Sequence, residues 1–582
     1  MKEKNILVNV GNTEIDLFEF IDQNSEVLKN QYLNIILQLS NFVINNQSLK
    51  DRLYFKDYSL WEMSLLQEKN IYKNRFIFKT IKYLALKKII TDNINENIKI
   101  FYLESDLASC LETEFKNLKI SFVGKSFSFL NKINQVIKKN IPLHFLYFLY
   151  YFFKNCSFRK FNDKVLTEKK FLIFSYFTHY DIKKFNEKIF YPKQWTGLWE
   201  EIIENTNFFQ IFLPNEKLKF FFQVENLVKK KNFKNLKKEN FINYFIYYKY
   251  FLKVFRDFKV FKSKILYYNI VKKIKDSENF RYFFEINEEI FISSFSGYTL
   301  LQNLLWINIF ENLFKNLPKH DYGMYLFENQ PWEKAFVRCW KKYNQGKLIG
   351  YCHTTVNFWN LNYFNIKDYN SSDDFKKFSP DLIAVSSEIS KNFIVNQSIN
   401  LGKVIEVEAL RYNWILDKKK DLNDKRIENR KIIFLGDYDK NINDKLIKIL
   451  KQSKDELMDL GFQVSYKPHP ATKIKNIGNK ISVIKEDLED LINNYRYIVS
   501  SNSTSAIIET LSCGLNTFLF IDKNNFNLSP IKNTKIEKNV EFFFTKDELI
   551  SKIENSQNNF EAVEYYYLDK ELKRWKKILE IK

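Results

Sequence analysis

Two short polar stretches about thirty residues apart have the residue types of a phosphate-binding site. Residues 467–470 read Lys-Pro-His-Pro and directly follow an apolar run, and residues 500–505 read Ser-Ser-Asn-Ser-Thr-Ser and directly follow another. A helical pattern begins after the second stretch and stops at Gly514. Each stretch is therefore predicted to lie at the carboxyl end of a β-strand, where open α/β sheets bind their ligands.

Together the two stretches offer groups that bind an anion. His469 and Lys467 would neutralise a phosphate, and the hydroxyl-rich helix start would bind its oxygens where the helix dipole favours negative charge. Glu509, one helical turn further on, could reach a ribose hydroxyl. The alternative is an ordinary helix cap and a turn built by two prolines. The predicted donor nucleotide and phosphate site consists of Lys467, His469, Pro470, Ser501, Ser503, Thr504, Ser505, Glu509 and Gly436.

A second set of candidate residues follows two other strand-like runs. Glu328 comes directly after residues 324–327, and His353 follows residues 348–351. A carboxylate or an imidazole at a strand end can remove the proton from an attacking hydroxyl. We therefore predict Glu328 and His353 as catalytic residues, with a structural role for both as the alternative. Glu333 is a third candidate, and we favour it as a carboxylate that meets the dipole of the following helix.

Composition and charge limit the class of protein and of partner. The chain has 582 residues, 45% of them hydrophobic, which is enough for two or three domains with large cores. Its net charge of +22 attracts polyanions. The basic residues are spread along the chain, without a zinc-finger, recognition-helix or RNA-binding pattern. We therefore favour an anionic membrane surface and an anionic substrate as partners, and expect no nucleic acid.

The cysteines and carboxylates indicate no metal centre. The five cysteines are widely spaced and form no CxxC pair, a pattern that suits a reducing cytoplasm better than a disulfide framework. Asp437 and Asp439 alone are weak evidence for a divalent ion. We expect no metal and no cofactor. The N-terminus enters a strand-like run at residues 6–10 directly, so no signal peptide is expected.

The alternation of apolar runs with helical patterns predicts an α/β protein. Residues 1–125 have the pattern of half of a doubly wound sheet, and residues 322–412 contain four further β units. A polar stretch then separates these from a fresh strand at residues 432–435. We predict two Rossmann-like domains that face a cleft in a GT-B-like arrangement. The predicted parts are an acceptor domain over 1–415 with helical insertions at about 126–165 and 216–316, a linker over 416–430, a donor domain over 431–560, and a terminal helix over 561–582.

Residues 141–153 are apolar on nearly every side and rich in aromatic residues. The run is too short to span a bilayer, which needs about twenty residues. Lysines and an arginine flank it, so a helix in the membrane interface, with its aromatic face among the headgroups, fits the pattern. A buried core helix is the alternative.

Several of these patterns resemble known families. The Lys-Pro-His-Pro turn and the serine-rich helix start resemble the HP and serine motifs of bacterial CMP-sugar transferases, which include sialyltransferases, polysialyltransferases and Kdo transferases of GT-B fold. Residues 328–334, 350–353 and 407–412 resemble more narrowly a family of bacterial surface-carbohydrate biosynthesis proteins. Trp61 and residues 175–177 also fit that family, so the resemblance covers most of the chain.

The resemblance implies a metal-independent glycosyltransferase. Such an enzyme would move a nonulosonic or Kdo-like sugar from a CMP-activated donor to a cell-surface glycan or its lipid-linked precursor, at the inner face of the cytoplasmic membrane. His469 and the serines would hold the CMP phosphate, and Glu328 would be the base. The acidic motif of the sialyltransferases is absent, and residues 328–330 read Glu-Asn-Gln in its place. A CDP-polyol phosphotransferase and a non-catalytic nucleotide- or glycan-binding envelope protein are the alternatives.

Overall fold

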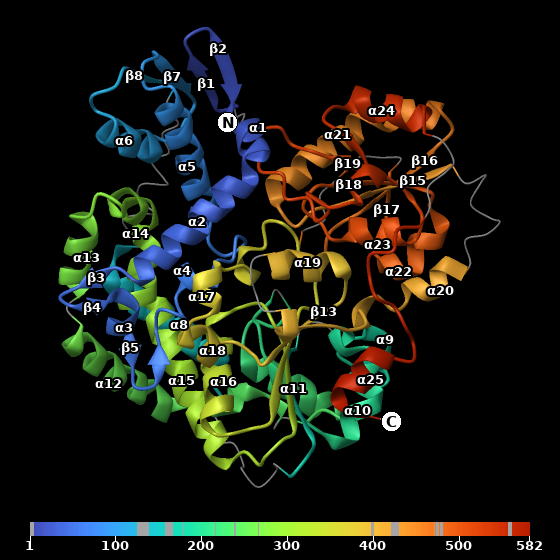
Figure 1. Ribbon diagram of the computed structural model, residues 1–582. Coiled ribbons are helices and arrows are strands. Elements are labelled where there is room, and N and C mark those ends of the chain that lie inside the picture. The colour runs from blue at the N-terminus through green and yellow to red at the C-terminus, as the bar shows by residue number, and fades with distance from the viewer. Residues whose placement is uncertain are drawn as a thin grey trace.

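The structure is a computed structural model (Figure 1). It describes residues 5–124, 139–157, 167–177, 180–215, 217–237, 240–265, 267–396, 401–420, 430–470, 472, 477, 481–556 and 562–581. Two six-stranded parallel sheets form its centre, and a smaller four-stranded sheet lies apart from them at the N-terminal end.

The small N-terminal sheet differs from the predicted half of a doubly wound sheet. Its order is β2-β1-β7-β8, and β1 pairs antiparallel with both neighbours. Gly11, at φ +56°, turns the chain straight back from β1 into β2, so β1 begins an antiparallel hairpin and not a parallel β-α-β unit. Its elements are β1 (Leu7–Val10), β2 (Thr13–Asp16), α1 (Leu17–Gln23), α2 (Ser25–Ser40), α5 (Phe76–Asp92), β7 (Ile98–Phe101), α6 (Ser105–Glu114) and β8 (Ile120–Val123).

Short elements join α2 to α5 and run along the next domain. They are β3 (Val43–Ile44), β4 (Gln47–Ser48), α3 (Leu49–Arg52), β5 (Tyr54–Phe55), β6 (Tyr58–Ser59) and α4 (Leu65–Glu68). The segment after β6 contains Trp61, which stacks on Phe295 at 6.1 Å between ring centroids. This packing brings the N-terminal segment against the helical insertion and next to the first large sheet.

The first large sheet has the order β10-β9-β11-β12-β13-β14, and all its neighbouring strands are parallel. Its strands are almost wholly buried, as expected for a sheet covered on both faces. The strands are β9 (Phe171–Tyr176), β10 (Thr206–Ile211), β11 (Tyr322–Leu326), β12 (Lys347–Tyr351), β13 (Leu382–Val385) and β14 (Val404–Glu406). The helices between them include α9 (Ile182–Asn186), α10 (Leu198–Ile202), α16 (Pro331–Lys342), α17 (Lys367–Asn370), α18 (Asp373–Phe378) and α19 (Glu388–Asn396).

A helical insertion separates β10 from β11, and a further helix precedes β9. They are α8 (Ile141–Asn155), α11 (Phe221–Lys231), α12 (Tyr248–Lys264), α13 (Tyr267–Lys275), α14 (Arg281–Ser296) and α15 (Tyr298–Asn316). The predicted insertion at about 126–165 lies partly outside the described residues. Within them, residues 281–316 are long and apolar enough to cross a membrane, but 78% of their most apolar window is buried inside the protein and Gly297 divides them into two helices.

The second large sheet has the order β17-β16-β15-β18-β19-β20, which is the Rossmann order for strands numbered along the chain. Its strands are β15 (Lys431–Leu435), β16 (Gln463–Lys467), β17 (Ser482–Val483), β18 (Tyr497–Ser501), β19 (Asn516–Phe520) and β20 (Glu541–Phe543). Its helices are α21 (Lys440–Asp459), α22 (Leu488–Leu491), α23 (Ala506–Ser512) and α24 (Lys546–Glu554). The predicted α/β, GT-B-like fold with two Rossmann-like domains is therefore confirmed.

The chain crosses between the two large sheets twice. It passes into the second one through α20 (Ile415–Lys420), so the predicted linker begins as a helix, and residues 421–429 lie outside the described part. It then returns, and α25 (Lys573–Leu579) packs beside α9 and α10 of the first domain (Figure 1). Trp575 of α25 lies edge-on to Tyr351 of β12 at 5.2 Å between ring centroids. The predicted terminal helix over 561–582 is thus shorter than expected and belongs spatially to the first domain.

Candidate functional site

The carboxyl ends of the two large sheets supply the candidate site. In an open parallel sheet, ligands bind outside these ends at the point where the strand order reverses. That point lies between β9 and β11 in the first sheet and between β15 and β18 in the second. Glu328 follows β11, while Asp437 follows β15 and Ser501 ends β18. Both reversal points therefore hold acidic or hydroxyl side chains.

The turn after β11 fixes the position of Glu328. Asn329 adopts a left-handed conformation with φ +59°, which asparagine tolerates better than most residues. Pro331 then begins α16, and the Glu333 carboxylate accepts hydrogen bonds from the backbone N–H groups of Glu328 and Asn329, at 3.1 and 2.9 Å. Glu333 is buried and holds the backbone before α16, a geometry that favours the helix-start role over catalysis.

Glu328 and His353 come together at the ends of β11 and β12. Their nearest Oε1 and Nε2 atoms are 3.9 Å apart, and 28% of the Glu328 side chain is exposed. A further ion pair stands next to them, between the buried Glu68 carboxylate and the Lys73 ammonium at 2.7 Å. The charges of both Lys73 and Glu68 act on Glu328. The sequence analysis missed this pair, because only folding brings residues 68–73 to the end of β11.

Burial sets the acidity of these carboxyls. It raises the pKa of Glu328 above its ordinary value, against the opposing effects of a hydrogen bond from Gln330 and the charge of Lys73. Burial likewise raises the pKa of Glu68, and Lys73 opposes it. Two carboxyls with raised pKa values beside a histidine are candidate groups for accepting and returning a proton.

Asp437 is the centre of the opposite side of the site. It is fully buried, and its carboxylate accepts hydrogen bonds from the hydroxyls of Ser501 and Ser503 and from the backbone N–H of Asp439 at 2.6 Å. The two serines predicted to bind a phosphate are thus engaged by a carboxylate. Because both serine hydroxyls donate to Asp437, they are less available to bind a phosphate at this reversal point.

His469 lies beside Asp437, and Gly436 sets its position. Burial lowers the pKa of His469, and the charge of Asp437 opposes this effect. The His469 ring is edge-on to Tyr438 at 5.8 Å between ring centroids. The Lys467 ammonium instead donates to the carbonyl of Glu486 at the far side of β16, and Pro470 is exposed. Of the predicted Lys-Pro-His-Pro group, only His469 therefore adjoins Asp437 and Tyr438.

The start of α23 presents fewer anion-binding groups than predicted. The Thr504 hydroxyl accepts a hydrogen bond from the Ala506 N–H at 3.3 Å, and the Ser505 side chain makes no cap bond to the helix. Glu509 lies opposite Arg411, which follows β14 and is exposed. Burial raises the pKa of Glu509 to about 7, against the charge of Arg411. Arg411 is therefore a cation of the first domain that lies beside α23. The sequence analysis did not predict this contact.

Aromatic and polar contacts join the two sides of the site. Tyr72 lies edge-on to Tyr438 at 6.4 Å between ring centroids, and its hydroxyl hydrogen-bonds the Asn357 side chain. The Thr355 hydroxyl is 3.1 Å from that of Tyr566. The loop after β12 and the loop after β15 thus meet across Tyr72, which comes from the N-terminal segment.

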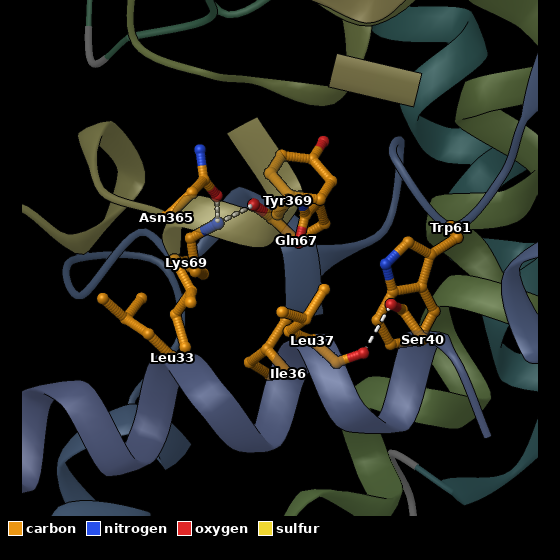
Figure 2. Close-up of a pocket in the computed structure, with 10 residues that line it drawn as sticks. Leu33, Ile36, Leu37, Ser40, Trp61, Gln67, Lys69, Asn365 and Tyr369 are labelled. Carbon is orange, nitrogen blue, oxygen red and sulfur yellow. Dashed lines mark hydrogen bonds between the residues drawn. The ribbon is translucent and has the colours of Figure 1, made fainter. Parts of the chain in front are cut away.

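A small pocket (Figure 2) is lined in part by Gln67, whose backbone carbonyl also accepts a hydrogen bond from the side chain of Asn329, the residue after Glu328. It is bounded by α2 and by Lys69, whose ammonium donates to the Gln67 carbonyl at 3.1 Å and to the Asn365 side chain at 2.9 Å. Burial and the nearby Lys334 lower the pKa of Lys69 to about 7. The volume of about 10 Å³ has room for roughly one water molecule. This pocket therefore supports the turn around Glu328 and does not receive a substrate.

Substituting Gly436 tests the position of His469. A Cβ atom at residue 436 would lie 2.7 Å from the Tyr466 hydroxyl and 3.0 Å from the backbone N of His469. We expect Gly436→Ala to shift the His469 turn, to weaken nucleotide binding at least about tenfold, and to cost about 1–3 kcal/mol of stability. Calorimetry and chemical denaturation measure the two effects, and unchanged nucleotide affinity would remove His469 from the binding site.

No family model and no curated protein matches the sequence. Among solved structures, the chain is similar to the UDP-GlcNAc 2-epimerase of Methanocaldococcus jannaschii, at 14% identity over 70% of this chain and 99% of the other, with a TM-score of 0.37. The Neisseria meningitidis UDP-GlcNAc 2-epimerase bound to UDP-GlcNAc gives 12% identity over 66% and 90%, with a TM-score of 0.35. The S. aureus MnaA–UDP co-structure gives 11% over 71% and 98%, with a TM-score of 0.38.

These comparisons correct the predicted function. The neighbours named above as 2-epimerases act on nucleotide sugars and are not CMP-sugar glycosyltransferases. The prediction of a CMP-dependent glycosyltransferase is therefore wrong, and the resemblance to sialyltransferases is not confirmed. The structure also gives a reason why the two motifs do not form the predicted phosphate site. The serines of the second stretch donate to Asp437, and Lys467 faces away from them. At such low identity and TM-scores, the neighbours correct this prediction but assign no activity of their own to this chain.

Proposed function

We propose that this chain is an enzyme that converts a nucleotide-activated sugar by acid–base catalysis between its two Rossmann-like domains. The observation that carries the proposal is that two titratable clusters follow strands beside the reversal points of the two sheets, and that Tyr72 joins the loops next to them. One cluster contains Glu328 and His353, and the other contains Asp437 and His469. Tyr72 lies between them and contacts both loops.

The nucleotide end of the ligand fits the second domain. Arg411 is exposed and carries a guanidinium, which binds phosphate oxygens in pairs. His469 lies at the end of the neighbouring strand and adds a donor. Ser503, which is half-buried and donates to Asp437, would contact sugar or ribose hydroxyls. Glu509, beside Arg411, keeps the role of a ribose contact.

The sugar end then faces Glu328. The carboxylate of Glu328 would take a proton from the sugar, and His353 or Glu68 would return one to the product. Both possible donors lie within the same cluster, so neither a second sugar acceptor nor a transferred group is needed. Burial raises the pKa values of Glu328 and Glu68, which makes both carboxylates better proton acceptors than exposed ones.

Binding and isotope exchange test the proposal together. Calorimetry would compare UDP, GDP and CMP and their sugar conjugates, with UDP-N-acetylglucosamine among them. Incubation in D₂O would then show by NMR whether deuterium enters the sugar. We expect binding of one nucleotide series and exchange at one sugar position. Arg411→Ala should lose binding, whereas the exposed control Lys538→Ala should keep it. Absence of binding by every nucleotide sugar, or binding without exchange, would contradict the proposal.

Nucleotide affinity should depend on pH through Glu509. Its pKa of about 7 lies above the value of about 4.3 for an unperturbed glutamate, so the folded protein holds this proton up to neutral pH. Above pH 7 the ionised Glu509 competes with phosphate for Arg411, so affinity should fall as pH rises from 6 to 8. Glu509→Gln should remove this fall. Calorimetry at three pH values measures it, and an unchanged pH profile in the variant would refute the competition.

A further inference from the structure

Two helices of the insertion present an exposed apolar face. On α8 the exposed side chains are Leu146, Tyr147, Tyr150 and Phe153, each between 50% and 59% exposed. On α12 they are Tyr248 and Leu252, at 71% and 65%. Large apolar side chains are normally scattered singly on a surface, and a contiguous group marks an interaction site.

The two helices pack side by side and expose the same side of the molecule. Their ring contacts run antiparallel, from Phe152 with Phe251 at 5.0 Å to Phe145 with Phe258 at 5.2 Å between centroids. Both helices turn their buried face toward α15. In each helix a buried position is followed by a lateral position, which faces the other helix, and then by an exposed position. Because the two helices are antiparallel, this shared order puts their exposed positions on the same side. The six exposed residues therefore form one apolar face.

The charged residues of α8 and α12 are almost all basic. The sequences of α8 and α12 contain seven basic residues and one acidic residue, Asp257. Asp257 is buried, where it accepts a hydrogen bond from Asn308 at 2.9 Å, so it contributes little negative charge to the surface. Lys249, Arg256 and Lys259 are exposed on α12, and the Lys154 ammonium lies 4.4 Å from the Tyr150 ring centroid.

We propose that this face, made of α8 and α12, docks on the surface of an anionic membrane. The apolar side chains would enter the headgroup region, where aromatic residues are stable, and the basic residues would attract anionic lipid. The helices would lie flat, because the exposed stripe of α8 runs along residues 146, 150 and 153 of one face. A nucleotide-sugar enzyme held there would act beside lipid-linked substrates, but the docking itself does not depend on the proposed activity.

Vesicle co-sedimentation tests the docking with the full-length chain. We expect it to bind vesicles of phosphatidylcholine with 30% phosphatidylglycerol and not pure phosphatidylcholine. The triple variant Leu146→Glu, Tyr150→Glu, Phe153→Glu should weaken binding at least about a hundredfold. Arg256→Gln with Lys259→Gln should weaken it about twenty-fivefold, at about fivefold per charge. The control Ile182→Glu, at an exposed apolar residue of α9, should bind as the wild type does.

Sedimentation velocity separates lipid docking from the other occupant of such a face, a second copy of this chain. Concentration-dependent dimers that disappear in the triple variant, together with no vesicle binding, would overturn the proposal. So would equal binding to both vesicle types, or binding that the triple variant retains. Circular dichroism of each variant confirms that the fold is intact, and the calorimetric binding of nucleotides reports separately on the proposed function.

Discussion

Replacing Glu328 by Gln is expected to slow conversion of the nucleotide sugar about a hundred- to ten-thousandfold and to leave nucleotide affinity within about threefold. Positioned acid–base groups contribute rate factors of about this size. The amide keeps the shape of the side chain and an oxygen that can accept from Gln330, and it leaves the Lys73–Glu68 ion pair in place, but it can no longer take a proton. The proposed nucleotide contacts, Arg411 and His469, are not part of the Glu328 cluster, so binding should survive.

Deuterium exchange and steady-state turnover measure this effect, with calorimetry as the check on binding. Glu187→Gln, at an exposed glutamate after α9, is the matched control and should leave both unchanged. The same assay assigns the base among its neighbours. Unchanged exchange in Glu328→Gln with a loss in Glu68→Gln or His353→Gln would move the base to that residue. Unchanged exchange in all three would end the acid–base proposal.

The strand ends were predictable from the sequence because they depend on local pattern. Glu328, His353 and His469 each follow a short apolar run, and each does lie at the carboxyl end of a parallel strand. The confirmed α/β fold with two Rossmann-like domains rests on the same alternation. Local periodicity also predicted that Glu333 would meet the start of α16, where it accepts two backbone N–H groups.

The partners of these residues were not predictable in the same way, because they are distant in sequence. Asp437 accepts from Ser501 and Ser503, more than sixty residues away, and this contact leaves the two serine hydroxyls less available to bind a phosphate. Glu68 and Lys73 reach Glu328 across about 260 residues. Pairings of this kind follow from tertiary packing and leave no periodic trace in the chain.

The prediction for the N-terminal sheet was wrong for a different reason. Its strands and helices alternate as those of a doubly wound sheet do, and the pattern does not show strand direction. Only the close pairing of Val10 with Thr13 across Gly11 shows that β1 enters an antiparallel hairpin. Alternation therefore indicates fold class more reliably than it indicates which sheet a strand joins.

Glu408→Ala is expected to lower the free energy of unfolding by about 2–4 kcal/mol. Glu408 is buried, and its carboxylate accepts the backbone N–H groups of Arg574 and Trp575 at 2.8 and 3.1 Å, at the start of α25. Leu572, which precedes the helix, makes no side-chain cap bond. Glu408, in the loop after β14, therefore caps the helix in its place. Alanine would leave two N–H groups without this acceptor.

The structural role of this cap makes its loss measurable in two ways. Because α25 is the element that returns from the second domain to the first, Glu408→Ala should release it before the rest unfolds, and proteases should then cut near residue 570 earlier than in the wild type. Glu408→Gln keeps one acceptor oxygen and should lose only about 1 kcal/mol. Glu571→Ala, at an exposed glutamate beside the same helix, is the control. Equal denaturation midpoints and equal cleavage rates in all four proteins would show that other contacts of α25, such as the Trp575 ring packing, hold the helix in place, and that the cap does not.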